Sequence, residues 1–138
     1  MYRLPTDVQL EITDKCNLRC RHCYHFDTDQ MPVSKDLSDE AIVALANKLI
    51  DAPVYSLVIT GGEPFLRPDV LLDIVRSAKE KGLFVSVNTN LIHATPKLLS
   101  ALRQFGLNNF LVSCPSSNAE MYRHMNKGDR PLYSNILQ

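Results

Sequence analysis

Three cysteines that lie close together in the sequence are the residues best suited to carry chemistry. Cys16, Cys20 and Cys23 have the spacing C-x3-C-x2-C and sit among polar and basic residues directly after a predicted strand. Exposed, unpaired thiols oxidise readily, so such a group is usually held by a metal or used in a reaction. The spacing therefore indicates a metal centre or a reactive loop rather than buried structural cysteines.

Two kinds of metal centre fit this loop. Zinc would use the three thiolates with His22 or His25 as a fourth ligand, although zinc sites usually pair two ligand couples and no second couple exists here. An iron–sulfur cluster would use the same thiolates. Its fourth iron would then be bound by Cys114 or be left open for a small chelating ligand. Lys15, Arg19 and Arg21 are predicted to favour the thiolate forms.

A second unusual segment is Gly61-Gly62-Glu63-Pro64, which follows a continuous apolar run. The two glycines permit a positive φ or a close approach of the backbone, and Pro64 fixes the exit from the turn. Glu63 places a carboxylate at the end of the strand. Taken alone, the segment would also fit a tight turn with a solvated acid.

Strand and helix patterns alternate along the whole chain. Apolar periodicity predicts strands at 8–12, 55–60, 84–88 and 110–113. Capping residues predict helices that begin after Ser38, at Pro68, after Thr95 and, from the Ser117–Glu120 capping-box spacing, near 117. This order predicts parallel strands with helices packed outside, in a TIM-like barrel or a doubly wound sheet. Both folds place the loops that follow the strands on one face.

The motifs together resemble the radical S-adenosylmethionine (radical SAM) superfamily. The resemblance rests on Cys16-Asn-Leu-Arg-Cys20-Arg-His-Cys23-Tyr24 followed by Ile59-Thr-Gly61-Gly62-Glu63-Pro64, and it runs to about Gly128. It implies an α/β fold, a partial TIM-like (β/α) barrel of parallel strands with about four of an expected six strand–helix units. It also implies an enzyme in which Cys16, Cys20 and Cys23 hold a [4Fe–4S] cluster whose open iron binds S-adenosylmethionine. Reductive cleavage of that cofactor would give a 5′-deoxyadenosyl radical, which abstracts hydrogen from the substrate.

The resemblance further implies a set of cofactor-binding residues. Gly61, Gly62, Glu63 and Pro64 would bind the methionine ammonium, and Ser113 would contact the ribose. The remaining contacts are assigned more loosely to His22 (adenine edge, through its backbone), Tyr24 (cofactor or packing), Asn90 (cofactor, substrate or turn cap) and Arg123 or Lys127 (cofactor carboxylate). Leu91 stands where the family has glycine.

Cys114 and Pro115 stand where an acid often follows in the family, and Cys114 is predicted to be a small buried side chain rather than a ligand.

The cysteine motif is similar to that of the SPASM/twitch branch, which modifies peptides, proteins or tetrapyrroles. A peptide substrate is therefore predicted ahead of a tetrapyrrole or another small molecule, together with a reductant such as flavodoxin or ferredoxin. The rival interpretations are a non-catalytic zinc or iron–sulfur interaction module and a simple electron-transfer protein. An electron-transfer protein needs no site for S-adenosylmethionine, so Gly61-Gly62-Glu63-Pro64 argues against it.

Length and charge bound these interpretations. The 138 residues suit one domain, and 15 basic and 15 acidic residues give no charge excess that would favour nucleic acid. No apolar run reaches the roughly 20 residues of a membrane helix, and the N-terminus lacks a signal-peptide pattern, so a cytoplasmic location is expected. We expect 1–138 to be an incomplete radical SAM core, a fragment completed by a partner, by further chain or by self-association through an open sheet edge.

Overall fold

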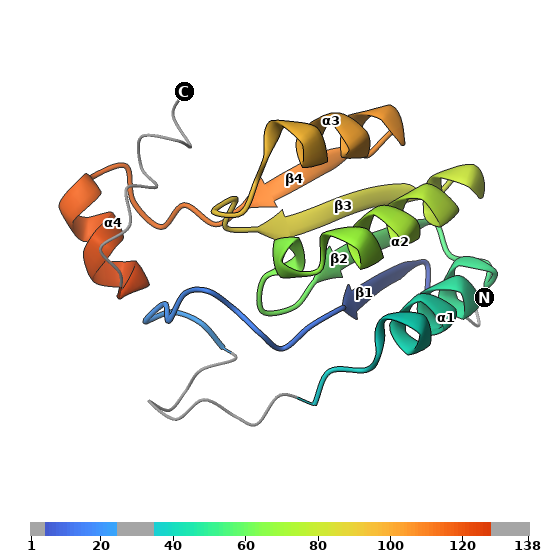
Figure 1. The fold of residues 1–138 in the computed structure, drawn as a ribbon, viewed down its shortest axis with the longest axis horizontal. Coiled ribbons are helices and arrows are strands. Elements are labelled where there is room, and N and C mark those ends of the chain that lie inside the picture. Colours follow the sequence, from blue (N-terminus) through green and yellow to red (C-terminus); the bar gives the residue numbers. More distant parts are fainter. Residues whose placement is uncertain (1–4, 25–34, 128–138) are drawn as a thin grey trace.

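Four strand–helix units follow one another in the computed structural model, which describes residues 5–24 and 35–127 (Figure 1). The strands are β1 (Asp7–Glu11), β2 (Ser56–Thr60), β3 (Phe84–Thr89) and β4 (Asn109–Val112). The helices are α1 (Asp39–Ile50), α2 (Pro68–Glu80), α3 (Pro96–Gln104) and α4 (Ala119–Asn126), and a 3-10 turn, η1 (Pro64–Leu66), precedes α2. The predicted elements are all present, with bounds that differ by one or two residues.

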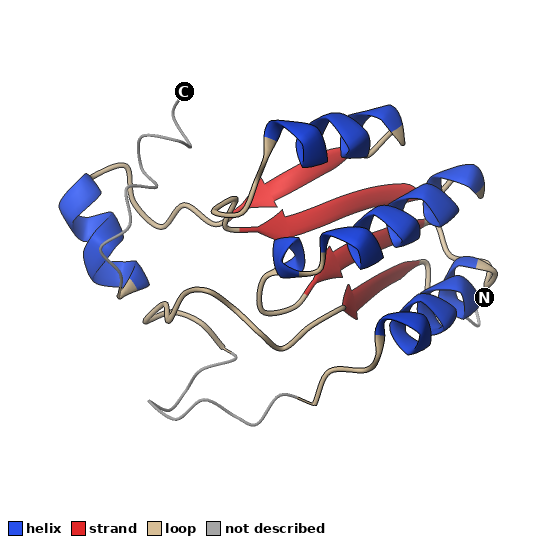
Figure 2. Cartoon of the chain, viewed as in Figure 1, coloured by secondary structure: helices blue, strands red, loops and turns tan. Residues whose placement is uncertain are grey.

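The strands form one parallel sheet in the order β1-β2-β3-β4. A doubly wound sheet reverses its strand order at a switch point, whereas a barrel adds each strand beside the previous one. Right-handed crossovers in this sequential order must place their helices on one face. Figure 2 shows α1, α2 and α3 on the same face of the sheet. The described chain is therefore a curved part of a TIM-like barrel, as predicted.

The two faces of the sheet differ in chemistry because side chains alternate along each strand. One face is apolar and packs against buried residues of α1, α2 and α3; its strand residues include Leu10, Leu57, Ile59, Val85 and Val87. The opposite face carries Gln9, Val58, Thr60, Ser86 and Asn88. Val58 is half-buried, so β2 is less completely enclosed than its apolar sequence predicts.

Side-chain caps fix where the helices begin. Ser38 Oγ accepts a hydrogen bond from the Ala41 amide, and Thr95 Oγ1 accepts one from the Leu98 amide, as predicted. The predicted cap of α4 is wrong. Asn118 takes this place because its Oδ1 accepts hydrogen bonds from two backbone amides, those of residues 120 and 121, each at 3.0 Å.

The loop between β1 and α1 carries the three cysteines (the cysteine loop), and its two ends are held together beside the start of α2. Arg67, at the start of α2, donates to the backbone carbonyl of Ile12 at 2.5 Å and to that of Leu37 at 3.1 Å. Asp36 accepts a hydrogen bond from Thr13 Oγ1 at 2.7 Å. These contacts hold the segment that enters the loop beside the segment that leaves it. None of the helices in the described part of the chain is long and apolar enough to cross a membrane.

Candidate functional site

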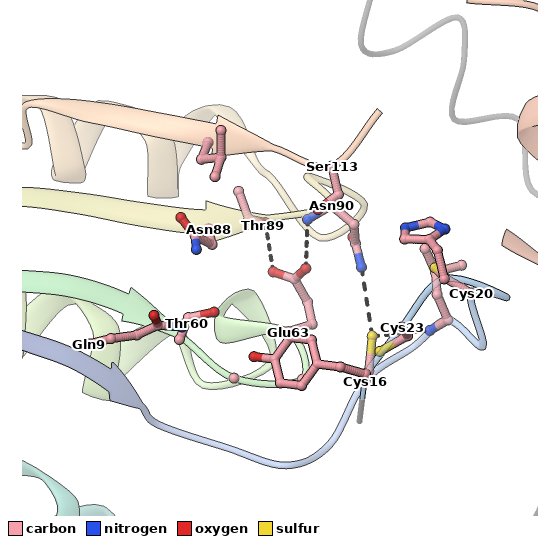
Figure 3. Close-up of a pocket in the computed structure, with 16 residues that line it drawn as sticks. Gln9, Cys16, Cys20, Cys23, Thr60, Glu63, Asn88, Thr89, Asn90 and Ser113 are labelled. Carbon is pink, nitrogen blue, oxygen red and sulfur yellow. Dashed lines mark hydrogen bonds between the residues drawn. The ribbon is translucent and has the colours of Figure 1, made fainter. Parts of the chain in front are cut away.

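All four loops at the carboxyl ends of the strands contribute to one cavity, as expected for parallel strands (Figure 3). Most of the predicted site residues line it; Pro64, which is buried at the start of η1, Arg123 and Lys127 do not. The predicted residues that line it are Cys16, Cys20, His22, Cys23, Tyr24, Gly61, Gly62, Glu63, Asn90 and Ser113. Residues separated by about a hundred positions in the sequence thus meet in one place.

The three clustered cysteines are free, half-buried thiols in this cavity. Within residues 5–24 and 35–127, no three Cys, His, Asp or Glu side chains converge on a point where one metal ion could sit. The ligands of a single zinc ion must converge in that way. The ligands of an iron–sulfur cluster bind separate iron atoms and need only surround a common space.

Burial rather than nearby positive charge controls the thiols in the metal-free protein. Loss of hydration raises the pKa of the Cys20 thiol to about 11, and it is also the main reason why the pKa of Cys16 is raised. Arg19 does lower the pKa of the Cys16 thiol, as predicted, but the effect of burial outweighs it. Arg19 itself donates to the Cys16 carbonyl at 3.2 Å. A metal would have to displace these protons when it binds.

The Gly61-Gly62 turn passes directly against the backbone of the cysteine loop. The Gly62 amide donates to the Thr13 carbonyl at 2.7 Å, and the Glu63 amide donates to the Lys15 carbonyl at 2.8 Å. A Cβ atom on Gly61 would lie 2.3 Å from the Thr13 carbonyl oxygen, and Gly61 also has a φ of +138°. Both glycines are therefore required for a close approach of two backbones, as the sequence predicts.

Glu63 is buried, with 1% of its surface exposed, so it is not a solvated acid. Its Oε1 accepts hydrogen bonds from the Phe65 amide at 3.0 Å and from Thr89 Oγ1 at 2.7 Å. Its Oε2 accepts one from the Asn90 amide at 2.8 Å. The carboxylate thus joins the ends of β2 and β3, and three of its roughly four acceptor positions are used.

Asn90 extends this network to the cysteine loop. Its Nδ2 donates to Asn17 Oδ1 at 2.9 Å. The same nitrogen lies 3.9 Å from Cys16 Sγ, and Figure 3 draws this contact as a dashed line. Its Oδ1 accepts a hydrogen bond from the Ile92 amide, so the side chain also caps its own turn. Leu91 adopts a φ of +59° there, the left-handed conformation that glycine usually provides.

The C-terminal end of α4 lies against the other side of the cysteine loop. The Arg21 amide donates to the Met125 carbonyl at 2.8 Å, and Arg21 Nε donates to the His124 carbonyl at 3.1 Å. Asn126 is buried, and its Oδ1 lies 3.1 Å from Cys20 Sγ. This end of α4 therefore contacts one of the clustered thiols directly.

The remaining predicted residues lie at the edge of the cavity or outside it. Ser113 is exposed at the cavity edge, where its amide donates to the Thr89 carbonyl at 2.9 Å. The Tyr24 hydroxyl donates to Glu11 Oε1 at 3.1 Å, and 71% of the tyrosine is exposed. His22 is exposed as well.

Cys114 is exposed and does not line the cavity, so the prediction of a buried side chain is wrong: it follows β4 on a solvent-facing segment. Arg123 donates to the Ala119 carbonyl of its own helix, and neither Arg123 nor Lys127 lines the cavity. His25, the other candidate zinc ligand, lies outside the described residues.

Sequence reasoning missed two groups of residues at this site. The first group lies on the polar face of the sheet: Gln9, Thr60 and Asn88 line the cavity. Their alternation with buried apolar residues was a readable signal. The second group is the asparagine pair Asn17 and Asn126, whose place beside the thiols depends on contacts between distant segments that no local pattern reports.

A model of the Radical SAM superfamily matches residues 10–135. The chain belongs to the radical SAM superfamily. Among its curated relatives, the GTP 3′,8-cyclase of Limosilactobacillus fermentum is 38% identical over 129 residues, which are 91% of this chain and 38% of that protein. The AdoMet-dependent heme synthase of Methanosarcina barkeri is 36% identical over 125 residues, which are 88% of this chain and 34% of that protein.

Solved structures agree on the fold. Methylornithine synthase superposes with a TM-score of 0.70 at 20% identity, covering 95% of this chain and 40% of that one. BtrN, solved in complex with AdoMet and 2-DOIA, superposes with a TM-score of 0.60 at 18% identity, covering 98% of this chain and 56% of that one. The predicted family, its fold and its [4Fe–4S] and S-adenosylmethionine cofactor pair are thereby confirmed. The radical SAM chain spans under two-fifths of the length of the two curated relatives named above.

Proposed function

We propose that this chain forms the cluster-binding part of a radical SAM enzyme core, with Cys16, Cys20 and Cys23 as the three cluster ligands. The observation that carries the proposal is that these thiols, and the Gly61-Gly62-Glu63 turn, line one cavity at the carboxyl ends of the strands. When bound, the cluster would supply the electron that cleaves S-adenosylmethionine to methionine and a hydrogen-abstracting 5′-deoxyadenosyl radical.

The residues present fit a thiolate-bound cluster. Three free thiols line the cavity, and the buried amide nitrogens of Asn17 and Asn126 beside them have no hydrogen-bond partner among the described residues. Unpartnered buried donors are costly unless an acceptor arrives, and a metal-bound thiolate is such an acceptor. The Leu18 amide already donates to Cys16 Sγ at 3.4 Å. The site thus offers donors to the negative charge that a cluster would bring.

The Gly61-Gly62-Glu63 turn is suited to the amino-acid end of S-adenosylmethionine. The side chain of Glu63 keeps one acceptor position free, on Oε2, after its three internal hydrogen bonds. A buried carboxylate that is already oriented by neighbouring donors binds a cationic amine without further ordering. Ser113 and Asn90, on the neighbouring strand ends, would complete the polar lining, and His22 and Tyr24 would lie at its open side.

Cofactor cleavage by the reconstituted protein tests this proposal. After anaerobic loading with iron and sulfide, we expect about four iron atoms per chain. Addition of dithionite and S-adenosylmethionine should then produce 5′-deoxyadenosine and methionine, measured by liquid chromatography. A full cluster that yields no 5′-deoxyadenosine would instead support a non-catalytic module, and stoichiometric zinc without sulfide would support a zinc site.

For the substrate, we propose a small molecule in place of the peptide that the cysteine motif predicts. The relatives that match over most of this chain carry the names GTP 3′,8-cyclase and heme synthase, and those names support small-molecule chemistry. The polar, uncharged side chains of Gln9, Ser86 and Asn88 on the inner face are compatible with such a ligand. Deuterium transfer into 5′-deoxyadenosine from deuterated GTP, compared with deuterated peptide pools, would distinguish the two classes.

A further inference from the structure

Asn126 is a buried polar residue that contacts a proposed cluster ligand. Only 3% of its surface is exposed, and its Oδ1 lies 3.1 Å from Cys20 Sγ. Its Nδ2 is buried beside the Tyr122 side chain and makes no hydrogen bond of good geometry in the described part of the chain. A buried amide nitrogen left unpaired costs roughly 1–3 kcal/mol, so this side chain is only half satisfied in the metal-free protein.

The contact suits a protonated thiol and not a metal ligand. A thiol S–H can donate to Oδ1, but a thiolate has no proton to donate and would face the oxygen lone pairs at 3.1 Å. The amide oxygen and nitrogen of asparagine have nearly the same shape. Rotating the group by half a turn would place the unpaired Nδ2 against the sulfur without moving α4.

We propose that Asn126 is a positioning residue for the cluster, whose Nδ2–H donates a hydrogen bond to the Cys20 thiolate when iron is bound. This inference rests on the proposed role of Cys20 as a cluster ligand. The turn of the amide would satisfy the donor that is unpaired in the metal-free protein. It would also neutralise part of the charge that accumulates on the sulfur when the cluster is reduced.

A comparison with Cys16, the neighbouring proposed cluster ligand, shows why the hydrogen bond from Asn126 is important for Cys20. Cys16 Sγ already receives the Leu18 amide at 3.4 Å and lies 3.9 Å from Asn90 Nδ2. Cys20 Sγ interacts with its own backbone amide and, among the described residues, contacts the Asn126 side chain. Asn126 reaches it because α4 is fixed to the cysteine loop through the hydrogen bonds of Arg21. The end of α4 therefore controls the charge environment of one ligand.

The midpoint potential of the reconstituted cluster tests this role. In an EPR-monitored titration with dithionite, without S-adenosylmethionine, we expect the Asn126→Leu variant to be harder to reduce than the unmodified protein. The hydrogen bond is present in both oxidation states and is stronger in the reduced one, so only that difference shifts the potential; we expect an equilibrium constant for reduction that is smaller by up to about tenfold, which is about 59 mV for a one-electron couple. Asn126→Ala removes both N–H groups without adding a charge and should shift the potential in the same direction.

Asn118→Ala is the matched control for a purely structural role of α4. It removes the cap that accepts hydrogen bonds from the Glu120 and Met121 amides, and so weakens α4 without touching Cys20. Its cluster should keep the unmodified potential. An unchanged potential in both Asn126 variants, or an equal shift in Asn118→Ala, would overturn the inference. If the unmodified protein assembles no cluster, it is the proposed function that fails instead.

Discussion

The Cys20→Ala variant is expected to lose the cluster and, with it, all cleavage of S-adenosylmethionine. Three thiols line the cavity, so each proposed ligand is required, and within the described residues Cys114 lies outside that cavity and cannot replace one. The amount of iron bound after reconstitution should fall roughly tenfold or more, because the described part of the site has no fourth cysteine that could replace the lost ligand. Iron and sulfide analysis, together with the visible charge-transfer absorption of the cluster, measures the change.

Two comparisons make this result specific. Cys114→Ala removes an exposed thiol near the same sheet edge and should leave iron content and cofactor cleavage unchanged. The metal-free Cys20→Ala protein should stay folded, because it loses one contact, with Asn126, worth about 1 kcal/mol. Circular dichroism checks this. Full iron loading of Cys20→Ala, or loss of the cluster in Cys114→Ala, would contradict the assignment of the ligands.

The second large effect is expected for Gly62→Ala, which should destabilise the metal-free protein by about 2–4 kcal/mol. A Cβ atom at this position would lie 2.1 Å from the Lys15 carbonyl oxygen and 2.4 Å from its carbonyl carbon. Backbone atoms cannot move aside as a flexible side chain can. The turn would have to shift, which breaks the hydrogen bonds from the Gly62 and Glu63 amides to the cysteine loop.

Urea denaturation of metal-free Gly62→Ala, followed by circular dichroism, measures this loss. Gly82→Ala is the control, because a Cβ there meets no heavy atom within 4 Å and the only cost is a φ of +80°. That cost is about 1–2 kcal/mol. The Gly62 variant should also bind iron poorly, since the shifted turn displaces the start of the cysteine loop. Equal stability of the two variants would show that the contact between the turn and the loop is not needed for folding.

The sequence predicted the scaffold well because local signals agreed with one another. The apolar periods, Pro68 and the Ser38 and Thr95 caps each mark an element boundary, and each boundary is observed within two residues. The exception is the start of α4, where two neighbouring residues can both cap a helix and Asn118 makes the two hydrogen bonds. Spacing alone could not decide between them.

The site was predicted only in part, because its chemistry depends on contacts between distant segments. The cysteine and Gly-Gly-Glu motifs could be read directly, but the three donors that hold Glu63 come partly from residues 89 and 90. The contact of Asn126 with Cys20 spans 106 positions. The raised pKa values of Cys16 and Cys20 could not be predicted, because basic residues nearby in the sequence do not reveal how deeply a sulfur is buried.

The most direct test of a three-thiolate cluster with one open iron is Mössbauer spectroscopy of protein reconstituted with iron-57. In a [4Fe–4S] cluster held by three cysteines, the fourth iron lacks a protein ligand and differs from the other three. We predict that S-adenosylmethionine changes the signal of about one iron in four and leaves the rest unaltered. Four equivalent irons that do not respond to S-adenosylmethionine would contradict the proposed site.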